Sequence, residues 1–194
     1  DPADRGKHLE LQIDGVATHC TVWVNGTELH HNNCGYTGFT VDLTPSARYG
    51  EDLNTVAIRV DANAMEGWWY EGAGMYRHSR LVKRPPVHFV TDGIFVQPVK
   101  TADGTWTIPA EITVENTGKT NLPATVSVTL RDPDGKEIAS LSETNSVAVL
   151  GTKVFTPVIK VADPKLWSVD HPALYTVETK VAVPGQSDDL VTTK

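Results

Sequence analysis

Apolar and polar residues alternate with a period of two over most of the chain, which is the pattern of half-buried β-strands. The first such segment, residues 9–14, ends at Gly15, and the next, residues 20–24, is followed by Asn25-Gly26. An Asn-Gly pair is the strongest short signal for a hairpin, because both residues accept the positive φ of a type I′ turn. No segment has convincing helical periodicity, so the pattern predicts an all-β protein.

Further strands are expected in both halves of the chain. In the second half, turn sequences rich in Asn, Asp, Gly and Pro stand at 115–119 and 132–136, between segments rich in Val, Thr and Ile. About seven short strands in a domain of about 100 residues favour an immunoglobulin-like sandwich. The expected strands are 39–43 and 54–60 in the first half, and 93–99, 105–115, 124–131, 137–142, 146–150, 153–161 and 174–183 in the second.

Consecutive prolines at 85 and 86 mark the best candidate for a domain boundary. Proline lacks the N–H that a central sheet ladder needs, and two in a row stiffen the chain. Aromatic residues become sparse after this point, and Val, Thr and Ile become common. We therefore expect two β-sandwich domains, residues 1–84 and residues 85–194.

Composition restricts the classes of function. The chain has 194 residues, 40% of them hydrophobic, and a formal net charge of −7 at pH 7, with Lys83-Arg84 as its longest basic cluster. Phosphate binding needs a concentrated positive surface, so no nucleic-acid partner is expected. No segment approaches the roughly 20 apolar residues of a membrane span, so no membrane partner is expected either. The sequences at Asp1 and Lys194 look like cuts through a longer polypeptide.

Three segments stand out as motifs. Residues 15–26 read G-V-A-T-H-C-T-V-W-V-N-G, residues 68–77 read W-W-Y-E-G-A-G-M-Y-R, and residues 166–175 read L-W-S-V-D-H-P-A-L-Y. In this order they resemble motifs of the family-two glycoside hydrolases, the group that contains β-galactosidase, β-glucuronidase and β-mannosidase. The family patterns have Ile where Met75 stands and Pro where Val169 stands. The second motif looks most like that of β-galactosidase-type members.

The resemblance implies a role for each part of the chain. Residues 1–84 correspond to the C-terminal part of the family's sugar-binding jelly-roll domain, and residues 85–194 to its immunoglobulin-like domain. The family's catalytic (β/α)8 barrel, expected after Lys194, normally supplies both catalytic glutamates, one of which follows an Asn. The chain contains no Asn-Glu pair. We therefore expect an accessory region, inactive alone, of a retaining enzyme that hydrolyses terminal β-galactosides or related β-glycosides.

The second motif contains the candidate substrate-binding residues of the parent enzyme. The rings of Trp68, Trp69 and Tyr70 suit stacking on sugar CH faces. The carboxylate of Glu71 suits hydrogen bonds from sugar hydroxyls, and Arg77 is a candidate ion-pair partner that holds the loop. The alternative is that the aromatic rings pack against the second domain or the barrel, while Arg77 forms an ordinary structural salt bridge.

Catalysis by this chain itself is not expected. Retaining glycosidases need two carboxylates about 5–5.5 Å apart, in a supported pocket that separates their pKa values. Glu66 and Glu71 are close in sequence, but a loop on a β-sandwich rarely gives such support. No catalytic residue is therefore assigned here.

No metal or cofactor is expected. His31 and Cys34 have the spacing of a zinc-ligand pair, but structural zinc needs four ligands, usually in two such pairs, and a solvated loop explains the two residues. Cys20 and Cys34 are expected to be free thiols, with a disulfide as the alternative, because bridging depends on their Cα separation.

The expected partners are the catalytic barrel of the same parent chain and a carbohydrate substrate. A jelly roll without its first strands exposes sheet edges, so self-association of this chain is a further expectation. The rival interpretation is an autonomous carbohydrate-binding module or adhesin that uses Trp68, Trp69 and Tyr70 as a stacking platform.

Overall fold

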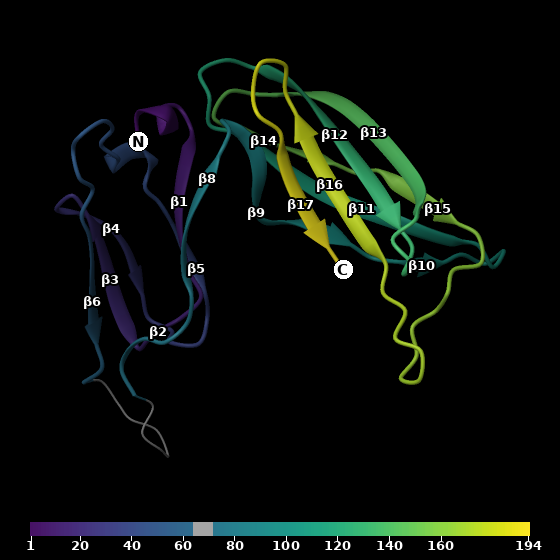
Figure 1. Ribbon diagram of the computed structural model, residues 1–194, viewed down its shortest axis with the longest axis horizontal. Helices are drawn as coiled ribbons and strands as arrows, with labels where there is room; N and C mark the ends of the chain where they lie inside the picture. The colour runs from purple at the N-terminus through teal and green to yellow at the C-terminus, as the bar shows by residue number, and fades with distance from the viewer. Residues whose placement is uncertain (64–71) are drawn as a thin grey trace. The chain divides into compact units, whose positions relative to one another are not determined.

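A computed structural model of the protein describes residues 1–63 and 72–194, which form two compact units, Asp1–Arg84 and Pro85–Lys194. Strands dominate both units, which confirms the expected all-β fold class of β-sandwiches (Figure 1). The helical elements of these residues are two short 3-10 helices, η1 (Pro2–Asp4) and η2 (Thr44–Ser46). In this part of the chain no helix is long and apolar enough to cross a membrane.

The first unit consists of two three-stranded antiparallel sheets and one short ladder. The sheets have the strand orders β5-β1-β8 and β4-β3-β6, and β2 pairs with β7. Alternate residues of β1 and β3 point inward and form a small apolar core with residues of the other strands. The strands are β1 (His8–Ile13), β2 (Val16–Ala17), β3 (His19–Val24), β4 (Thr27–Asn32), β5 (Phe39–Asp42), β6 (Val56–Asp61), β7 (Gly74–Met75) and β8 (Ser79–Arg84).

The Asn-Gly turn between β3 and β4 is the hairpin that the sequence predicts. Asn25 and Gly26 have φ angles of 52° and 88°, as a type I′ turn requires. The Asn25 side chain donates to the carbonyl oxygen of Ser46 at 2.7 Å and accepts from the N–H of Thr55 at 3.0 Å. The turn therefore also fastens η2 and the segment that leads into β6.

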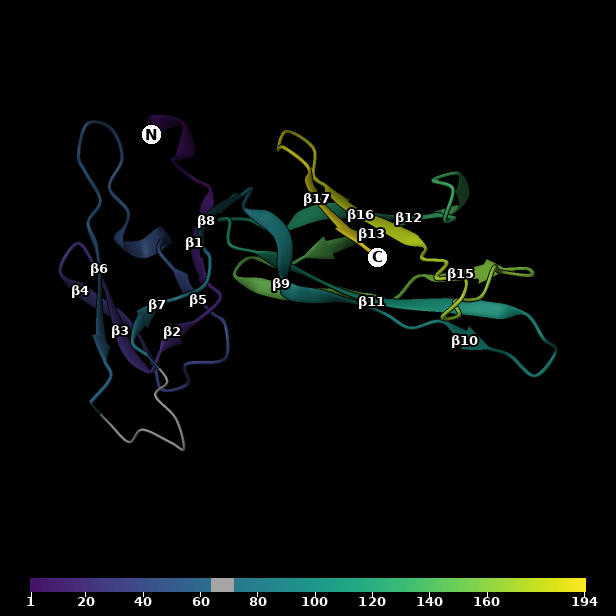
Figure 2. The ribbon, with the colours of Figure 1, turned by 60° about the horizontal axis from the view of Figure 1, so that its bottom comes forward.

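The second unit is a sandwich of two antiparallel sheets, seen as two layers in Figure 2. One sheet has the order β13-β12-β16-β17, and the other is organised around β11, which pairs with β9, β10, β14 and β15. Such a strand order is typical of an immunoglobulin-like sandwich. The strands are β9 (Val87–Val96), β10 (Val99–Lys100), β11 (Trp106–Asn116), β12 (Leu122–Arg131), β13 (Glu137–Val147), β14 (Gly151–Phe155), β15 (Val158–Val161), β16 (Thr176–Ala182) and β17 (Asp189–Thr193).

The core of the second unit follows from the alternation along β11 and β12. Ile112 and Val114 from one sheet and Val126 and Leu130 from the other are fully buried, together with Phe155. Burying a side chain of this size contributes roughly 1.5–3 kcal/mol relative to leaving it exposed. The two sheets are therefore held together mainly by this apolar layer.

Two predicted strand boundaries in the second unit are wrong. The segment 153–161 divides into β14 and β15, because Pro157 has no N–H to continue the ladder. The segments 137–142 and 146–150 belong instead to a single strand, β13, which ends at Val147. Its partner β12 pairs with it along its whole length, so the ladder continues through the intervening polar residues.

Strand β9 also begins earlier than residue 93, where the pattern places its start. Asp92-Gly93 has turn chemistry, but the pair forms an irregularity within the strand, with Asp92 at a φ of 57° and a register shift against β11. Gly93 is required there, because a Cβ would lie 2.8 Å from the carbonyl oxygen of Val90. A turn signal alone does not distinguish a bulge from a strand end.

In the first unit, Asp4 fastens η1 to β8. Its carboxylate accepts hydrogen bonds from Lys83 at 2.5 Å and from Lys7 at 3.0 Å. The hydrogen bond from Lys83, followed by that from Lys7, lowers the pKa of Asp4 from 3.8 to about 2.

We predict that acid weakens the first unit through Asp4. The folded pKa lies below the unfolded one, so the stabilisation is present above about pH 4 and is lost as the pH falls from about 4 to about 2. Asp4→Asn should lower the melting temperature at pH 7 and flatten its dependence on pH in that range, as followed by circular dichroism. Asp52→Asn, at an exposed loop position, is the control. An unchanged acid dependence in Asp4→Asn would contradict this role.

Candidate functional site

The candidate sugar-contacting residues Trp68, Trp69, Tyr70 and Glu71 lie outside the described residues, and so does Glu66. Their geometry therefore stays a prediction. The structure does describe the residues on either side of this segment, and these fix where its two ends begin.

The strands on either side of this segment, β6 and β7, pair with two consecutive strands, β3 and β2. On one side, Asp61 at the end of β6 pairs with His19 of β3. On the other side, Gly74 of β7 pairs with Ala17 of β2. Because Ala17 and His19 are two residues apart, Asp61 and Gly74 lie near one another in the first unit.

Tyr76 anchors the chain directly after β7. Its hydroxyl donates a hydrogen bond to the carbonyl oxygen of Gly35 at 2.7 Å. The ring approaches the backbone of Gly15 so closely that a Cβ there would lie 3.0 Å from the Tyr76 hydroxyl oxygen. The second motif therefore depends on a glycine of the first motif, although about 60 residues separate them.

Arg77 is the one candidate site residue that is described, and among the described residues its side chain contacts a backbone carbonyl. Its Nη1 donates to the backbone carbonyl oxygen of Asp14 at 3.4 Å. The ion pair with the Asp14 carboxylate is made by Arg80, at 2.8 Å. The register of β8 against β1 places Arg80 opposite Gln12, from where its side chain reaches the Asp14 carboxylate diagonally, and the sequence alone does not reveal the register.

Two described carboxylates, Asp103 and Asp134, have lowered pKa values because neighbouring groups donate hydrogen bonds to them. The hydroxyl of Thr101 lowers the pKa of Asp103, and the ammonium of Lys165 lowers that of Asp134. A glycosidase acid needs a raised pKa, so these groups are suited to pairing and not to proton donation.

Cys20 is buried and Cys34 is exposed, and both are free thiols, as expected. Within residues 1–63 and 72–194 no group of three or more His, Cys, Asp or Glu side chains is placed to hold a metal.

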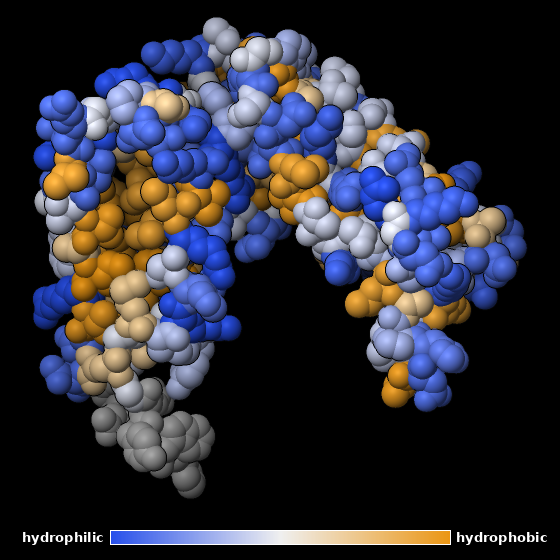
Figure 3. Space-filling view, in the orientation of Figure 1, coloured by the Kyte–Doolittle hydropathy of each residue, from blue (hydrophilic) through white to orange (hydrophobic). Residues whose placement is uncertain are grey.

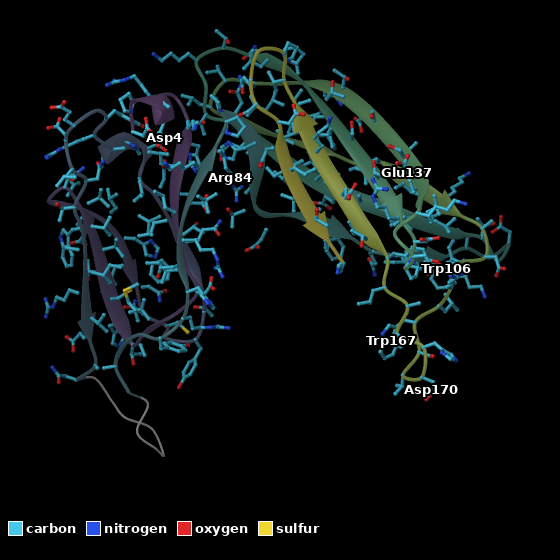
Figure 4. The ribbon with its side chains drawn as sticks, viewed as in Figure 1. Asp4, Arg84, Trp106, Glu137, Trp167 and Asp170 are labelled. Atoms are coloured by element: carbon cyan, nitrogen blue, oxygen red, sulfur yellow. The ribbon has the colours of Figure 1, made fainter. Side chains whose placement is uncertain are left out.

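The third motif forms a loop between β15 and β16 in the second unit. Ser168 and His171 close a turn in which the Ser168 N–H donates to the His171 carbonyl and the His171 N–H donates to the Ser168 hydroxyl. The Lys165 N–H donates to the Tyr175 hydroxyl at 2.8 Å. This turn forms although Val169 stands where the family pattern has proline. Figure 4 shows Trp167 and Asp170 on the loop, which extends beyond the sheets.

A groove of about 420 Å³ lies beside this loop, and sequence reasoning did not find it. Its walls come from both sheets and from the C-terminal end of the described chain, so no single segment carries a signal for it. Lining residues include Val96, Trp106, Ile108, Leu130, Tyr175 and Lys194.

The second unit, with its immunoglobulin-like strand order and its third motif, matches the family model described as Glycosyl hydrolases family 2 over residues 87–194. The match covers more than half of the chain. The chain therefore belongs to glycosyl hydrolases family 2, which confirms the resemblance read from its motifs.

The relatives are much longer than this chain. A β-galactosidase of Bacteroides ovatus, BoGH2A, is 35% identical over 182 residues, which are 93% of this chain and 21% of that protein. A putative β-glucuronidase of Formosa agariphila is 32% identical over 92% of this chain and 16% of its own length. The crystal structure of a family-two member from Bacteroides cellulosilyticus has a TM-score of 0.89 at 30% identity, over 99% of this chain and 25% of that one. The chain spans about a fifth of the length of these curated relatives.

We predict that Tyr76→Phe destabilises the first unit by about 1 kcal/mol, because the carbonyl of Gly35 loses its hydrogen bond. Urea unfolding followed by circular dichroism measures this change. Tyr49→Phe is the matched control, since the Tyr49 hydroxyl makes no hydrogen bond to the described residues while its ring faces Arg5. Equal stability of Tyr76→Phe and the native chain would show that the contact does not anchor β7.

Proposed function

We propose that this chain is a non-catalytic accessory region of a retaining β-galactosidase-type glycoside hydrolase. The parent then hydrolyses terminal β-galactosides or related β-glycosides. The observation that carries the proposal is the match to BoGH2A, which extends over 93% of this chain but only 21% of that β-galactosidase. In this proposal both catalytic glutamates belong to a (β/α)8 barrel that follows residue 194, and the two β-sandwich units brace it.

The electrostatics of the described residues support an accessory role. Retaining hydrolysis needs one carboxyl with a raised pKa and a second carboxylate about 5–5.5 Å from it. Asp4 and Asp134 instead have lysine partners that lower their pKa values and keep both groups ionised. These carboxylates hold elements together, which is a structural use of charge.

We further propose that Trp68, Trp69, Tyr70 and Glu71 contact the sugar in the parent, with Arg77 at the base of the same segment. Support comes from the frame on both sides, because pairing with β2 and β3 fixes where the segment begins and ends. Arg77 has five N–H donors, and the bond to the Asp14 carbonyl engages one of its nitrogens. Among the described residues, its other nitrogens have no hydrogen-bond partner, which leaves them for a carboxylate or a hydroxyl.

The expected outcome is that the parent hydrolyses 4-nitrophenyl β-galactoside and the isolated 194-residue chain does not. In the parent, Trp69→Ala should raise KM more than it lowers kcat, because stacking contributes mainly to substrate binding. Hydrolysis by the isolated chain that Glu71→Gln abolishes would refute the non-catalytic role. Titration of the isolated chain with galactose or lactose, followed by Trp fluorescence, tests the alternative. A saturable response would favour an autonomous carbohydrate-binding module.

Self-association of this chain is a further proposal. Strands β6 and β8 are at the edges of their sheets, and Val56 and Leu81 on them are exposed. Figure 3 shows apolar side chains gathered on the visible face of the first unit. Free edges next to apolar side chains are templates for strand pairing between copies.

Light scattering of the isolated chain should therefore give a mass that rises with protein concentration. Val56→Lys and Leu81→Lys should shift the distribution toward the monomer, because a charge on an edge strand opposes pairing. Leu150→Asn, on the turn between β13 and β14 of the second unit, should have no such effect. A constant monomer mass in the native chain would refute the proposal.

A further inference from the structure

The outer face of the sheet around β11 exposes large apolar side chains. Alternate residues of β11 point into the core, so the residues between them point outward, together with their neighbours on the adjoining strands. On this outward side Phe95 is 62% exposed, Val158 is 48% exposed, and Val99 and Val154 are each 43% exposed. Single exposed apolar residues are ordinary, whereas several on one face mark an interaction surface.

The outer face of the other sheet of the second unit has a different chemistry. The residues of β12 that alternate with its buried core positions carry hydroxyl groups, which pair with hydroxyl groups of β13. The hydroxyl oxygens of Thr125 and Thr144 are 2.9 Å apart, and those of Ser127 and Ser142 are 2.8 Å apart. An antiparallel sheet with one solvated face has this alternation of apolar and polar residues. The apolar outer face of the β11 sheet departs from it, which indicates a partner there.

The strand registers arrange the outward side chains of the β11 sheet in rows. In the middle row, Pro109 of β11 lies beside Val158 of β15. The row on one side of it has Val99 and Lys160 at its two ends. The row on the other side contains Phe95. Large apolar side chains therefore stand on both sides of a central apolar row.

We infer that the outward side chains of Phe95, Val99, Pro109, Val154 and Val158, together the Phe95 face, bind the Phe95 face of a second copy of this chain. A two-fold axis along the middle row lays Phe95 of each copy on Val99 of the other and brings Val158 against its own symmetry mate. The strands of the two packed sheets then run nearly antiparallel, within the roughly 30° that is usual for sheets packed face to face. The Phe95 face is thus complementary to itself, as an isologous dimer requires.

The charges beside the Phe95 face are complementary in the same arrangement. Glu111 of β11 is paired with Phe95, and Lys160 of β15 is in the row that contains Val99. The symmetry that lays Phe95 on Val99 therefore also brings Glu111 of each copy toward Lys160 of the other. Opposite charges at the rim favour this arrangement over alternatives that oppose like charges.

The size and chemistry of the Phe95 face define the kind of complex. Three strands about 4.8 Å apart, with rows about 7 Å apart, give a patch on the order of a few hundred Å². A standard stable interface buries about 800 Å² per partner, so the dimer should be weak and reversible. A sugar is a poorer fit, because sugar sites need several convergent hydrogen-bonding groups and the Phe95 face is mostly aliphatic.

Exchange of the two charges tests the pairing, with the dissociation constant of the 194-residue chain measured by sedimentation equilibrium. The reference chain and all variants carry Val56→Lys and Leu81→Lys, which suppress strand pairing at β6 and β8. Glu111→Lys and Lys160→Glu should each weaken the dimer by about fivefold, because like charges then face each other. The variant that carries both exchanges should dimerise as the reference chain does, since opposite charges face each other again.

Phe95→Asp tests the apolar contact in the same reference chain. It should weaken the dimer by about tenfold or more, because the aromatic ring loses its contact and a charge takes its place. Leu190→Asp is the matched control, since Leu190 is 63% exposed and lies on β17 of the other sheet. Circular dichroism of both variants verifies that the fold is retained.

Cross-linking tests the position of the two-fold axis. Cys34 is the exposed thiol of the chain and Cys20 is buried, so the variants carry Cys34→Ser. Val158→Cys should then be cross-linked to its own copy by a short bismaleimide. Ser142→Cys, at an exposed position on the outer face of the other sheet, should not be.

Several results would overturn the inference. One is a reference chain that stays monomeric up to millimolar concentration. Others are equal dissociation constants for Phe95→Asp and Leu190→Asp, a double charge variant no tighter than the single ones, and equal cross-linking of Val158→Cys and Ser142→Cys. None of these measurements involves glycosidase activity, so the inference and the proposed function can fail separately.

Discussion

The inward-facing residues of β11 are the constraint on which the second unit depends. Ile108, Ala110, Ile112 and Val114 alternate into the core, while the two edges of the strand pair with four other strands. The partners change near Pro109 on the edge shared with β9 and β10 and at Pro157 on the other edge, because a proline cannot donate to the ladder. Strands β9 and β14 therefore cover one end of β11, and the shorter β10 and β15 pair with the other. The groove opens at this second end, beside Trp106 and Ile108.

The residues that identify the family act largely as backbone anchors in the described part of the chain. Asn25 of the first motif ties η2 and the start of β6 to the β3–β4 turn. The hydroxyl of Tyr76, in the second motif, donates a hydrogen bond to the Gly35 carbonyl oxygen. The hydroxyl of Tyr175, in the third motif, accepts one from the N–H of Lys165. Each contact satisfies a backbone group in an irregular segment, where no ladder partner exists. Family motifs outside the catalytic domain can thus reflect loop architecture.

The sequence predicts the strands that alternate over a long stretch, such as β11, β12 and β16, because each has one buried face. It fails for β8 and β17, which are at sheet edges and whose polar and charged residues carry no burial signal. The sequence also does not predict which distant segments contact one another. The ion pair of Asp14 with Arg80 depends on the register of β1 against β8. The groove likewise depends on side chains from several strands and could not be read from any one of them.

Among the described residues, the edge strands β6 and β8 and the loop between β15 and β16 both expose apolar side chains, but they differ in how their backbone groups are paired. At β6 and β8 the edge-strand backbone is open on one side, so a partner must supply N–H and C=O groups as well as apolar side chains. In the loop between β15 and β16, the N–H groups of Lys165, Ser168 and His171 already have partners within the loop, so a partner would meet mainly side chains there. Strand pairing is weakened by a charge on the edge, and side-chain docking by truncation of its central aromatic residue. The two modes of association are therefore separable by mutation within one chain.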